Sequence, residues 1–342
     1  MNKRFPLRAA SFLLAALLLL SALGCRKDPA ALLESSKEEK TVVMTIGGMD
    51  VPMELYRYAM LNHKADYERG ASVDIWLGND GQALIDKLNA DVTETLTALY
   101  ATPTLCQAYG IDPEDSYITD AVDARMSEIY EPYGGDYAAY TADLADYNMN
   151  DGVYRFIVRN DVLAEELLYA MITRGEITND SDELRSIIES DDFIRVKQIL
   201  LPADNGKTID ENRAQAEELL GMLRDGADFD ELVGLYGGDV NLFDNPDGYY
   251  ITKGSYLHAF EDAAFSLAVG EVSGIVETPV GISIIKRYEK EPAYLTAHAD
   301  ELANDYISSQ YNLAVEAHQA TLTVTPTDAL SDYGIFNLDI TK

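Results

Sequence analysis

Histidine and cysteine side chains, which can bind a metal or, for cysteine, act as a nucleophile, are few in this sequence and lie far apart. They are His63, His258, His298, His318, Cys25 and Cys106. These residues form no cluster with the spacing of a metal site, and no Asp-rich segment has the spacing of a calcium loop. We therefore expect the protein to use no metal and no cofactor.

The sequence is strongly acidic. Its 342 residues include 59 Asp and Glu against 26 Lys and Arg, which gives a formal net charge of −33. A surface of this sign repels phosphate backbones, so we expect no nucleic-acid partner. The hydrophobic content of 47% is ordinary for a globular protein, and the length suffices for two or three domains.

The two cysteines lie in different settings. Cys106 stands in the apolar run 104–109 and is expected to be a small buried side chain. Cys25 follows an N-terminal basic segment and an apolar run over 9–20, which is the layout of a secretory signal over 1–24. The layout resembles the bacterial lipobox, although Ala22 stands where Leu is usual.

The same segment is too short for a membrane anchor of its own. Its apolar run, extended to Leu23, falls below the roughly 20 residues that span a bilayer. We therefore expect a lipid on Cys25 and a charged tether over 25–40. The protein would then be held at the extracytoplasmic face of a bacterial cell membrane.

Hydrophobic periodicity predicts a mostly helical N-terminal region. A short strand at 41–46, a turn at Gly47-Gly48 and a return strand at 49–51 predict a hairpin, followed by a helix that begins at Pro52. Apolar residues at spacings of three and four predict a long helix over 80–109, and Asp112 is the expected cap of the next one. Further helices are expected at 113–130, 136–146, 151–173 and 295–319, and a short strand at 321–325.

The segment 193–288 has a different pattern. Strands rich in β-branched residues are expected at 193–202, 274–278 and 282–288. Helices are expected after the capping residues Asp210 and Asp228 and near 259–267. This order predicts an α+β fold in which an antiparallel sheet pairs its first and last strands.

Four motifs in this segment are similar to those of parvulin-type prolyl isomerases. They are Gly226-Ala-Asp-Phe229, Phe260-Glu-Asp-Ala-Ala-Phe-Ser-Leu267, Gly270-Glu-Val-Ser273 and Val276-Glu-Thr-Pro-Val-Gly281. The preceding hairpin, long helix and amphipathic helices resemble the chaperone domain of the PrsA and SurA extracytoplasmic foldases. The resemblance implies a helical lobe over 41–191, an inserted parvulin-like domain over 192–291, and a C-terminal part, 292–342, that packs back on the lobe.

The resemblance also implies where a substrate proline would bind. Phe260 would form the floor of the pocket, with Tyr256 and Leu257 as its walls. Asp239 matches the position beside the rotating carbonyl, and Thr278 matches a threonine at the rim. Read from the residues alone, Phe260, Tyr256 and Leu257 could also be ordinary core residues, and Asp239 could be a turn residue.

Two positions depart from the family pattern. Gln198 and Ser283 stand where parvulins have histidines. Gln198 shares a strand face with apolar residues and must find a buried partner, and a hydrogen bond to Ser283 could replace the histidine pair. All four positions with polar side chains, Gln198, Asp239, Thr278 and Ser283, are therefore candidate catalytic residues.

Two functions remain open from the sequence. The first is a membrane-anchored foldase that isomerises X-Pro bonds in unfolded or newly secreted polypeptides. The alternative is a holdase chaperone whose helical lobe binds apolar segments of unfolded polypeptides, while its parvulin-like domain is catalytically weak or inactive. A lipoprotein that captures small solutes would need strand–helix alternation over two lobes, which this sequence lacks.

Overall fold

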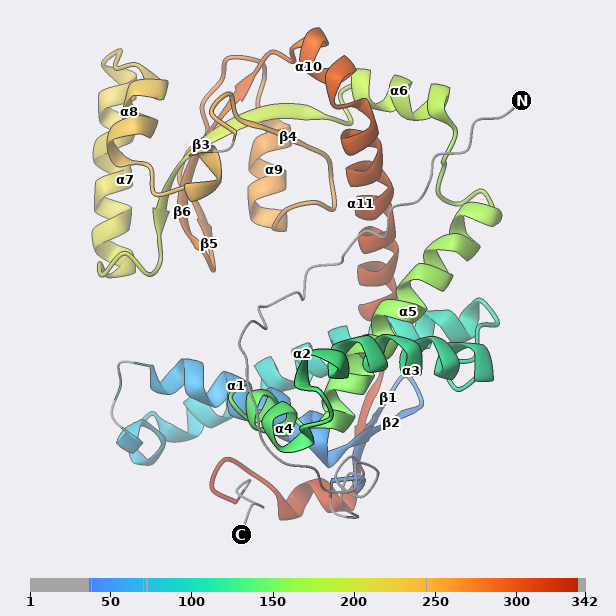
Figure 1. The fold of residues 1–342 in the computed structure, drawn as a ribbon. Coiled ribbons are helices and arrows are strands. Elements are labelled where there is room, and N and C mark those ends of the chain that lie inside the picture. Colours follow the sequence, from blue (N-terminus) through green and yellow to red (C-terminus); the bar gives the residue numbers. More distant parts are fainter. Residues whose placement is uncertain (1–36, 38, 70, 72, 244, 338–342) are drawn as a thin grey trace. The chain divides into compact units, whose positions relative to one another are not determined.

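The computed structural model describes residues 37, 39–69, 71, 73–243 and 245–337 (Figure 1). The expected signal over 1–24, Cys25 and most of the tether therefore lie outside the described residues. The chain divides into two compact units. One is Gly175–Leu313, and the other combines residues 37–174 with residues 314–337.

The unit that contains the N-terminal region is mainly helical. Its helices are α1 (Met53–Glu68), η1 (Val73–Leu77), α2 (Gly81–Ala108), α3 (Ser116–Tyr130), η2 (Glu131–Tyr133), α4 (Tyr137–Ala145), α5 (Asp151–Thr173), the end of α11 (Ala299–Gln319) and η4 (Asp328–Asp332). Its strands are β1 (Val42–Ile46), β2 (Met49–Pro52) and β7 (Val324–Pro326). They form an antiparallel sheet in the order β2-β1-β7.

The expected hairpin is present between β1 and β2. Ile46 pairs with Met49, and the two glycines between them have φ of 57° and 84°. Positive φ at both central positions is the requirement of a type I′ turn, which glycine meets without steric cost. The third strand comes from the far end of the sequence, because Thr45 of β1 pairs with Thr325 of β7.

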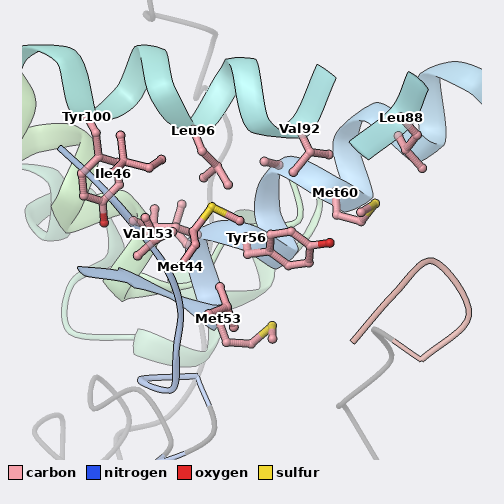
Figure 2. Close-up of a cluster of buried hydrophobic side chains, with 14 of the residues drawn as sticks. Met44, Ile46, Met53, Tyr56, Met60, Leu88, Val92, Leu96, Tyr100 and Val153 are labelled. Carbon is pink, nitrogen blue, oxygen red and sulfur yellow. The ribbon is translucent and has the colours of Figure 1, made fainter. Parts of the chain in front are cut away.

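The core of this unit confirms the apolar stripe predicted for the long helix. Leu88, Val92 and Leu96 are fully buried at intervals of four residues along α2, and Figure 2 shows them facing the residues of α1 and β1. Tyr100, one turn further, lies 5.1 Å from Phe156 of α5 between ring centroids. Burial of each large apolar side chain stabilises the fold by about 1.5–3 kcal/mol.

The helix that follows α2 begins later than expected. Gly110 has φ of 78° and ends α2 as predicted, but α3 begins at Ser116 and not at Pro113. The N-cap is Asp115, whose carboxylate accepts from the Tyr117 amide, so the prediction of Asp112 as the cap was wrong. Asp112 instead accepts from the Glu114 amide within the preceding turn, a local bond that competes with helix formation.

The second unit has an α+β fold. Its helices are α6 (Ser181–Glu189), α7 (Ile209–Arg224), α8 (Phe229–Tyr236), η3 (Val240–Phe243), α9 (His258–Ser266), α10 (Pro292–Ala297) and the first part of α11. Its strands are β3 (Ile194–Pro202), β4 (Tyr249–Ile251), β5 (Val276–Thr278) and β6 (Gly281–Tyr288). The sheet is antiparallel in the order β4-β3-β6-β5, which confirms the predicted pairing of the first and last strands.

The two faces of this sheet carry different helices (Figure 1). On one face, Ile199 and Ile284 pack in a cluster with residues of α7 and α8. On the other, Ile194 and Ile285 pack with Phe260 of α9. Because side chains alternate along a strand, Gln198 and Ser283 belong to the face that α9 covers.

Two local expectations for this unit were wrong. The N-cap of α7 is Thr208 and not Asp210, since Thr208 and Glu211 form a reciprocal capping box. The helix expected at 295–319 is two helices, α10 and α11, because His298 between them has φ of −111° and leaves the helical conformation. The predicted cap Asp228 is confirmed, because its carboxylate accepts from the Glu231 amide.

Candidate functional site

The site is built around a buried carboxylate, that of Asp239, which is 8% exposed. Its Oδ2 accepts from Gln198 Nε2 at 2.6 Å and from the Tyr249 hydroxyl, and its Oδ1 accepts from the Asn241 amide at 3.1 Å. Three donors satisfy the oxygens of this carboxylate in a place that excludes most water. Asp239 is therefore held by side chains and is more than a turn residue.

The loop before Asp239 lies against strand β3. The Gly238 amide donates to Leu200 O at 2.8 Å. A Cβ at Gly238 would come within 2.6 Å of Pro202 Cγ, so a larger residue would move the loop off the strand. This close approach brings Asp239 within reach of Gln198.

The hydrogen bond expected between Gln198 and Ser283 is present. Ser283 Oγ donates to Gln198 Oε1 at 2.7 Å, and both side chains are buried. The residues are diagonal neighbours across β3 and β6, because Gln198 lies opposite Ile285 and Ser283 lies opposite Leu200.

The order of donors in this chain is fixed by Asp239. An ionised carboxylate only accepts, so Gln198 must present its amide nitrogen to Asp239 and its oxygen to Ser283. The Ser283 hydroxyl is therefore a donor. At the other end, burial together with the hydrogen bond and charge of Asp239 raises the pKa of Tyr249, which keeps that hydroxyl protonated as well.

Aromatic rings line the apolar part of the site. Phe260 is 4% exposed and belongs to the core between α9 and the sheet. The Tyr256 ring stacks on it, with 5.3 Å between centroids, and lies 6.3 Å from the Tyr249 ring. Leu257, just before α9, is 45% exposed. Phe260 thus lies beneath a partly exposed surface formed by Tyr256 and Leu257. Tyr249 lies next to Tyr256 and donates to Asp239, so it connects this surface to the carboxylate.

Thr278 is not hydrogen-bonded to this chain of polar groups. Its Oγ1 donates to Gly281 O at 3.1 Å, across the turn that joins β5 and β6. The structure thus brings Gln198, Asp239 and Ser283 together, and places Thr278 in the neighbouring hairpin.

Sequence reasoning missed two residues of the site. Tyr249 holds Asp239 from strand β4, which the sequence pattern did not predict. Glu261, 3% exposed, accepts at Oε1 from the amides of Gly254, Ser255 and Tyr256 at 2.7–2.9 Å. Its position inside the motif that begins at Phe260 was the available signal, because a buried acidic residue requires donors.

The fold and this site define a protein class, which comparison with known sequences supports. Residues 183–291 match the PPIC-type PPIASE domain, so this part of the chain is similar to parvulin-type prolyl isomerases. Together with the helical unit, this makes the protein similar to the PrsA and SurA foldases.

Individual relatives have modest identity. Foldase protein PrsA of Geobacillus kaustophilus is 27% identical over 231 residues, which cover 62% of this chain and 73% of that protein. Foldase protein PrsA of Oceanobacillus iheyensis is 40% identical over 77 residues, or 22% of this chain and 26% of that protein. Chaperone SurA of Idiomarina loihiensis is 24% identical over 190 residues, or 53% of this chain and 43% of that protein. The chain thus spans less than half of the second and third relatives.

Solved structures of PrsA proteins are also among those similar to this chain. The crystal structure of peptidylprolyl isomerase PrsA from Bacillus anthracis has a TM-score of 0.35 at 16% identity, over 66% of this chain and 94% of that one. Foldase protein PrsA from Streptococcus pneumoniae has a TM-score of 0.34 at 18% identity, over 76% of this chain and 92% of that one.

Proposed function

We propose that this protein is a membrane-anchored extracytoplasmic foldase that isomerises X-Pro bonds in unfolded or newly secreted polypeptides. The observation that carries the proposal is the polar chain from Ser283 through Gln198 to Asp239, which lies beside the aromatic surface of Phe260 and Tyr256. The parvulin-type domain over 183–291 supports the same activity.

The chemistry requires no covalent bond to the protein. The barrier is the partial double bond of the X-Pro amide, about 18–20 kcal/mol, and a catalyst must favour the twisted amide over the planar one. Phe260 would hold the proline ring in a partly dry place. Amide resonance puts negative charge on the carbonyl oxygen, so the carboxylate of Asp239 beside that oxygen would disfavour the planar form.

We assign Gln198 and Ser283 the place that two histidines hold in related isomerases. Their hydrogen bond, together with the bond from Gln198 to Asp239, supports this assignment because it fixes the carboxylate on the face of Phe260. Neither side chain titrates near neutral pH, so this pair would not itself give the histidine-like pH dependence between pH 5 and 8.

NMR exchange spectroscopy on an X-Pro peptide with the full-length protein in detergent tests the proposal. Faster cis–trans exchange than in buffer alone is expected. Asp239→Asn is a suitable comparison, because it removes the charge and keeps the shape, and we expect it to slow exchange. Exchange equal to that in buffer would rule out the isomerase.

A specific feature also favours the holdase alternative. Leu235, Val240 and Phe243 are 67%, 68% and 85% exposed, and the segment that contains them also contains Asp239. Exposed apolar residues in one segment suit the binding of unfolded polypeptides. If the protein does not catalyse exchange, suppression of aggregation of a denatured test protein would identify the holdase.

The membrane anchor is a separate part of the proposal. Cys25 would carry the lipid, which the signal-like sequence before it supports. In the part of the chain that the structure describes, no helix is both long and apolar enough to cross a bilayer. Incorporation of a radiolabelled fatty acid into the protein, lost in Cys25→Ser, is the expected result in bacterial cells. Equal labelling of both proteins would contradict an anchor at this residue.

A further inference from the structure

The hydroxyl of Tyr256 has no structural role at the site described above. Tyr256 is 40% exposed, and its ring stacks on Phe260 at an interplanar angle of 25°. The ring of Tyr249, whose hydroxyl donates to Asp239, lies 6.3 Å away. Tyr256 therefore lies at the open edge of the surface proposed for the proline ring, on the side of the polar chain.

The hydroxyl of Tyr256 is available to a ligand. Among the described residues it makes no hydrogen bond, whereas the hydroxyl of Tyr249 is occupied by Asp239. Burial and the charges of Asp239 and Asp305 raise the pKa of Tyr256 to about 12. The group thus remains a protonated donor at neutral pH.

The backbone beneath Tyr256 is fixed from two sides. Glu261 accepts from the Tyr256 amide at 2.7 Å and from the amides of the two preceding residues. On the other side, Gly254 lies so close to α11 that a Cβ would come within 2.6 Å of Ser309 O and 2.7 Å of Leu313 Cγ. A donor on such a segment is preorganised, so little ordering is needed when a substrate binds.

We propose that the Tyr256 hydroxyl donates a hydrogen bond to the prolyl nitrogen of the twisted X-Pro amide. This inference rests on the isomerase activity proposed above and assigns to Tyr256 a catalytic role beyond that of an apolar wall. No bond is made or broken, since the hydroxyl keeps its proton throughout.

The chemical reason is the change in the nitrogen during rotation. In the planar amide its lone pair is delocalised into the carbonyl and is a poor acceptor. When the amide twists, the lone pair returns to the nitrogen, which then accepts a hydrogen bond. A donor that reaches this nitrogen therefore stabilises the transition state more than the bound substrate, which raises kcat without tightening binding.

Tyr256→Phe in the full-length protein tests the inference. The variant keeps the ring that stacks on Phe260, so we expect kcat to fall about tenfold and KM to stay within about twofold. Tyr169→Phe is the matched control, because Tyr169 is a 62% exposed tyrosine on α5 of the other unit, and its turnover should equal that of the wild type.

The possible outcomes separate this inference from the function on which it rests. Wild-type turnover together with an unchanged kcat in Tyr256→Phe would overturn the role of the hydroxyl and leave the isomerase intact. A raised KM at unchanged kcat would also overturn it, because the hydroxyl would then only bind substrate. Exchange equal to that in buffer for the wild type would overturn both.

Discussion

Gln198 Nε2 lies 2.6 Å from Asp239 Oδ2, and this bond joins the middle of strand β3 to the loop after α8. Both residues are 8% exposed. The bond gives a polar residue on an otherwise apolar strand face its partner, and it fixes the carboxylate on the face that also carries Phe260. Stability and the proposed catalysis thus depend on the same contact.

Gln198→Met should therefore destabilise the protein by about 1–3 kcal/mol, because it leaves a buried carboxylate and a buried hydroxyl short of a partner. Ser283→Ala should cost less, about 1 kcal/mol, since it removes only one donor from an amide oxygen. Urea denaturation of both variants gives the two free energies of unfolding. Equal stability of Gln198→Met and wild type would show that the network is not coupled to folding.

The capping box of α7 allows a direct test of sequence against structure. Thr208→Ala should lower the free energy of unfolding by about 1 kcal/mol, because it exposes an unpaired amide of the first turn. Asp210→Ala should change it by less than about 0.5 kcal/mol, since its ion pair with Arg213 is on the surface. The reverse order in a thermal or urea melt would restore Asp210 as the cap.

Gly254, in the segment that carries Tyr256, can be compared with Gly206, which has a similar backbone conformation. They have φ of 89° and 81°, but only Gly254 has a close neighbour where a Cβ would be. Alanine at Gly206 should cost about 1–2 kcal/mol from backbone strain alone. At Gly254 a further cost of about 1–3 kcal/mol is expected from the clash with Ser309 O, again measured by urea denaturation. Equal costs would show that α11 moves aside freely.

Two tyrosines of the helical unit are hydrogen-bonded to carboxylates, and we expect them to make the protein less stable in alkali. Burial and Asp151 raise the pKa of Tyr130 to about 12, and burial and Asp143 raise that of Tyr133 to about 12. In the unfolded chain both would ionise near pH 10. The contribution of these two tyrosines to the free energy of unfolding is therefore fully present below pH 10 and is lost as the pH rises from 10 towards 12.

Free energies of unfolding at about pH 8 and about pH 10.5 should therefore differ, with the lower value at the higher pH. Tyr130→Phe should reduce that difference, because one ionising group is removed from the unfolded chain. An undiminished difference in this variant would mean that Tyr130 titrates alike in both states.

Thiol counting tests the burial of Cys106 and the lipid on Cys25 together. Cys106 is fully buried, and burial raises the pKa of its thiol to about 12, so a thiol reagent at about pH 8 should not reach it in the native protein. In denaturant, the full-length protein from bacterial cells should yield one thiol if Cys25 carries a thioether lipid. Two reactive thiols would contradict the anchor, and Cys106→Ser, with none expected, is the control.

The sequence by itself determined the features that depend on neighbouring residues. The Gly47-Gly48 turn, the stripe from Leu88 to Leu96, the Asp228 cap and the face of Gln198 all follow from local steric rules and from the periods of helix and strand. The motifs around Phe260 further indicated the parvulin-type domain that the match over 183–291 supports.

Only the tertiary structure decided the contacts between distant segments. The bond from Gln198 to Asp239 and the pairing of β1 with β7 join residues whose separation in the sequence leaves no local pattern. Each such contact must offset the entropy of closing the intervening loop, and it does so only together with the packing around it. Asp210 and Asp112 show the same principle at short range, because each could cap a helix and a neighbouring residue, Thr208 or Asp115, does so instead.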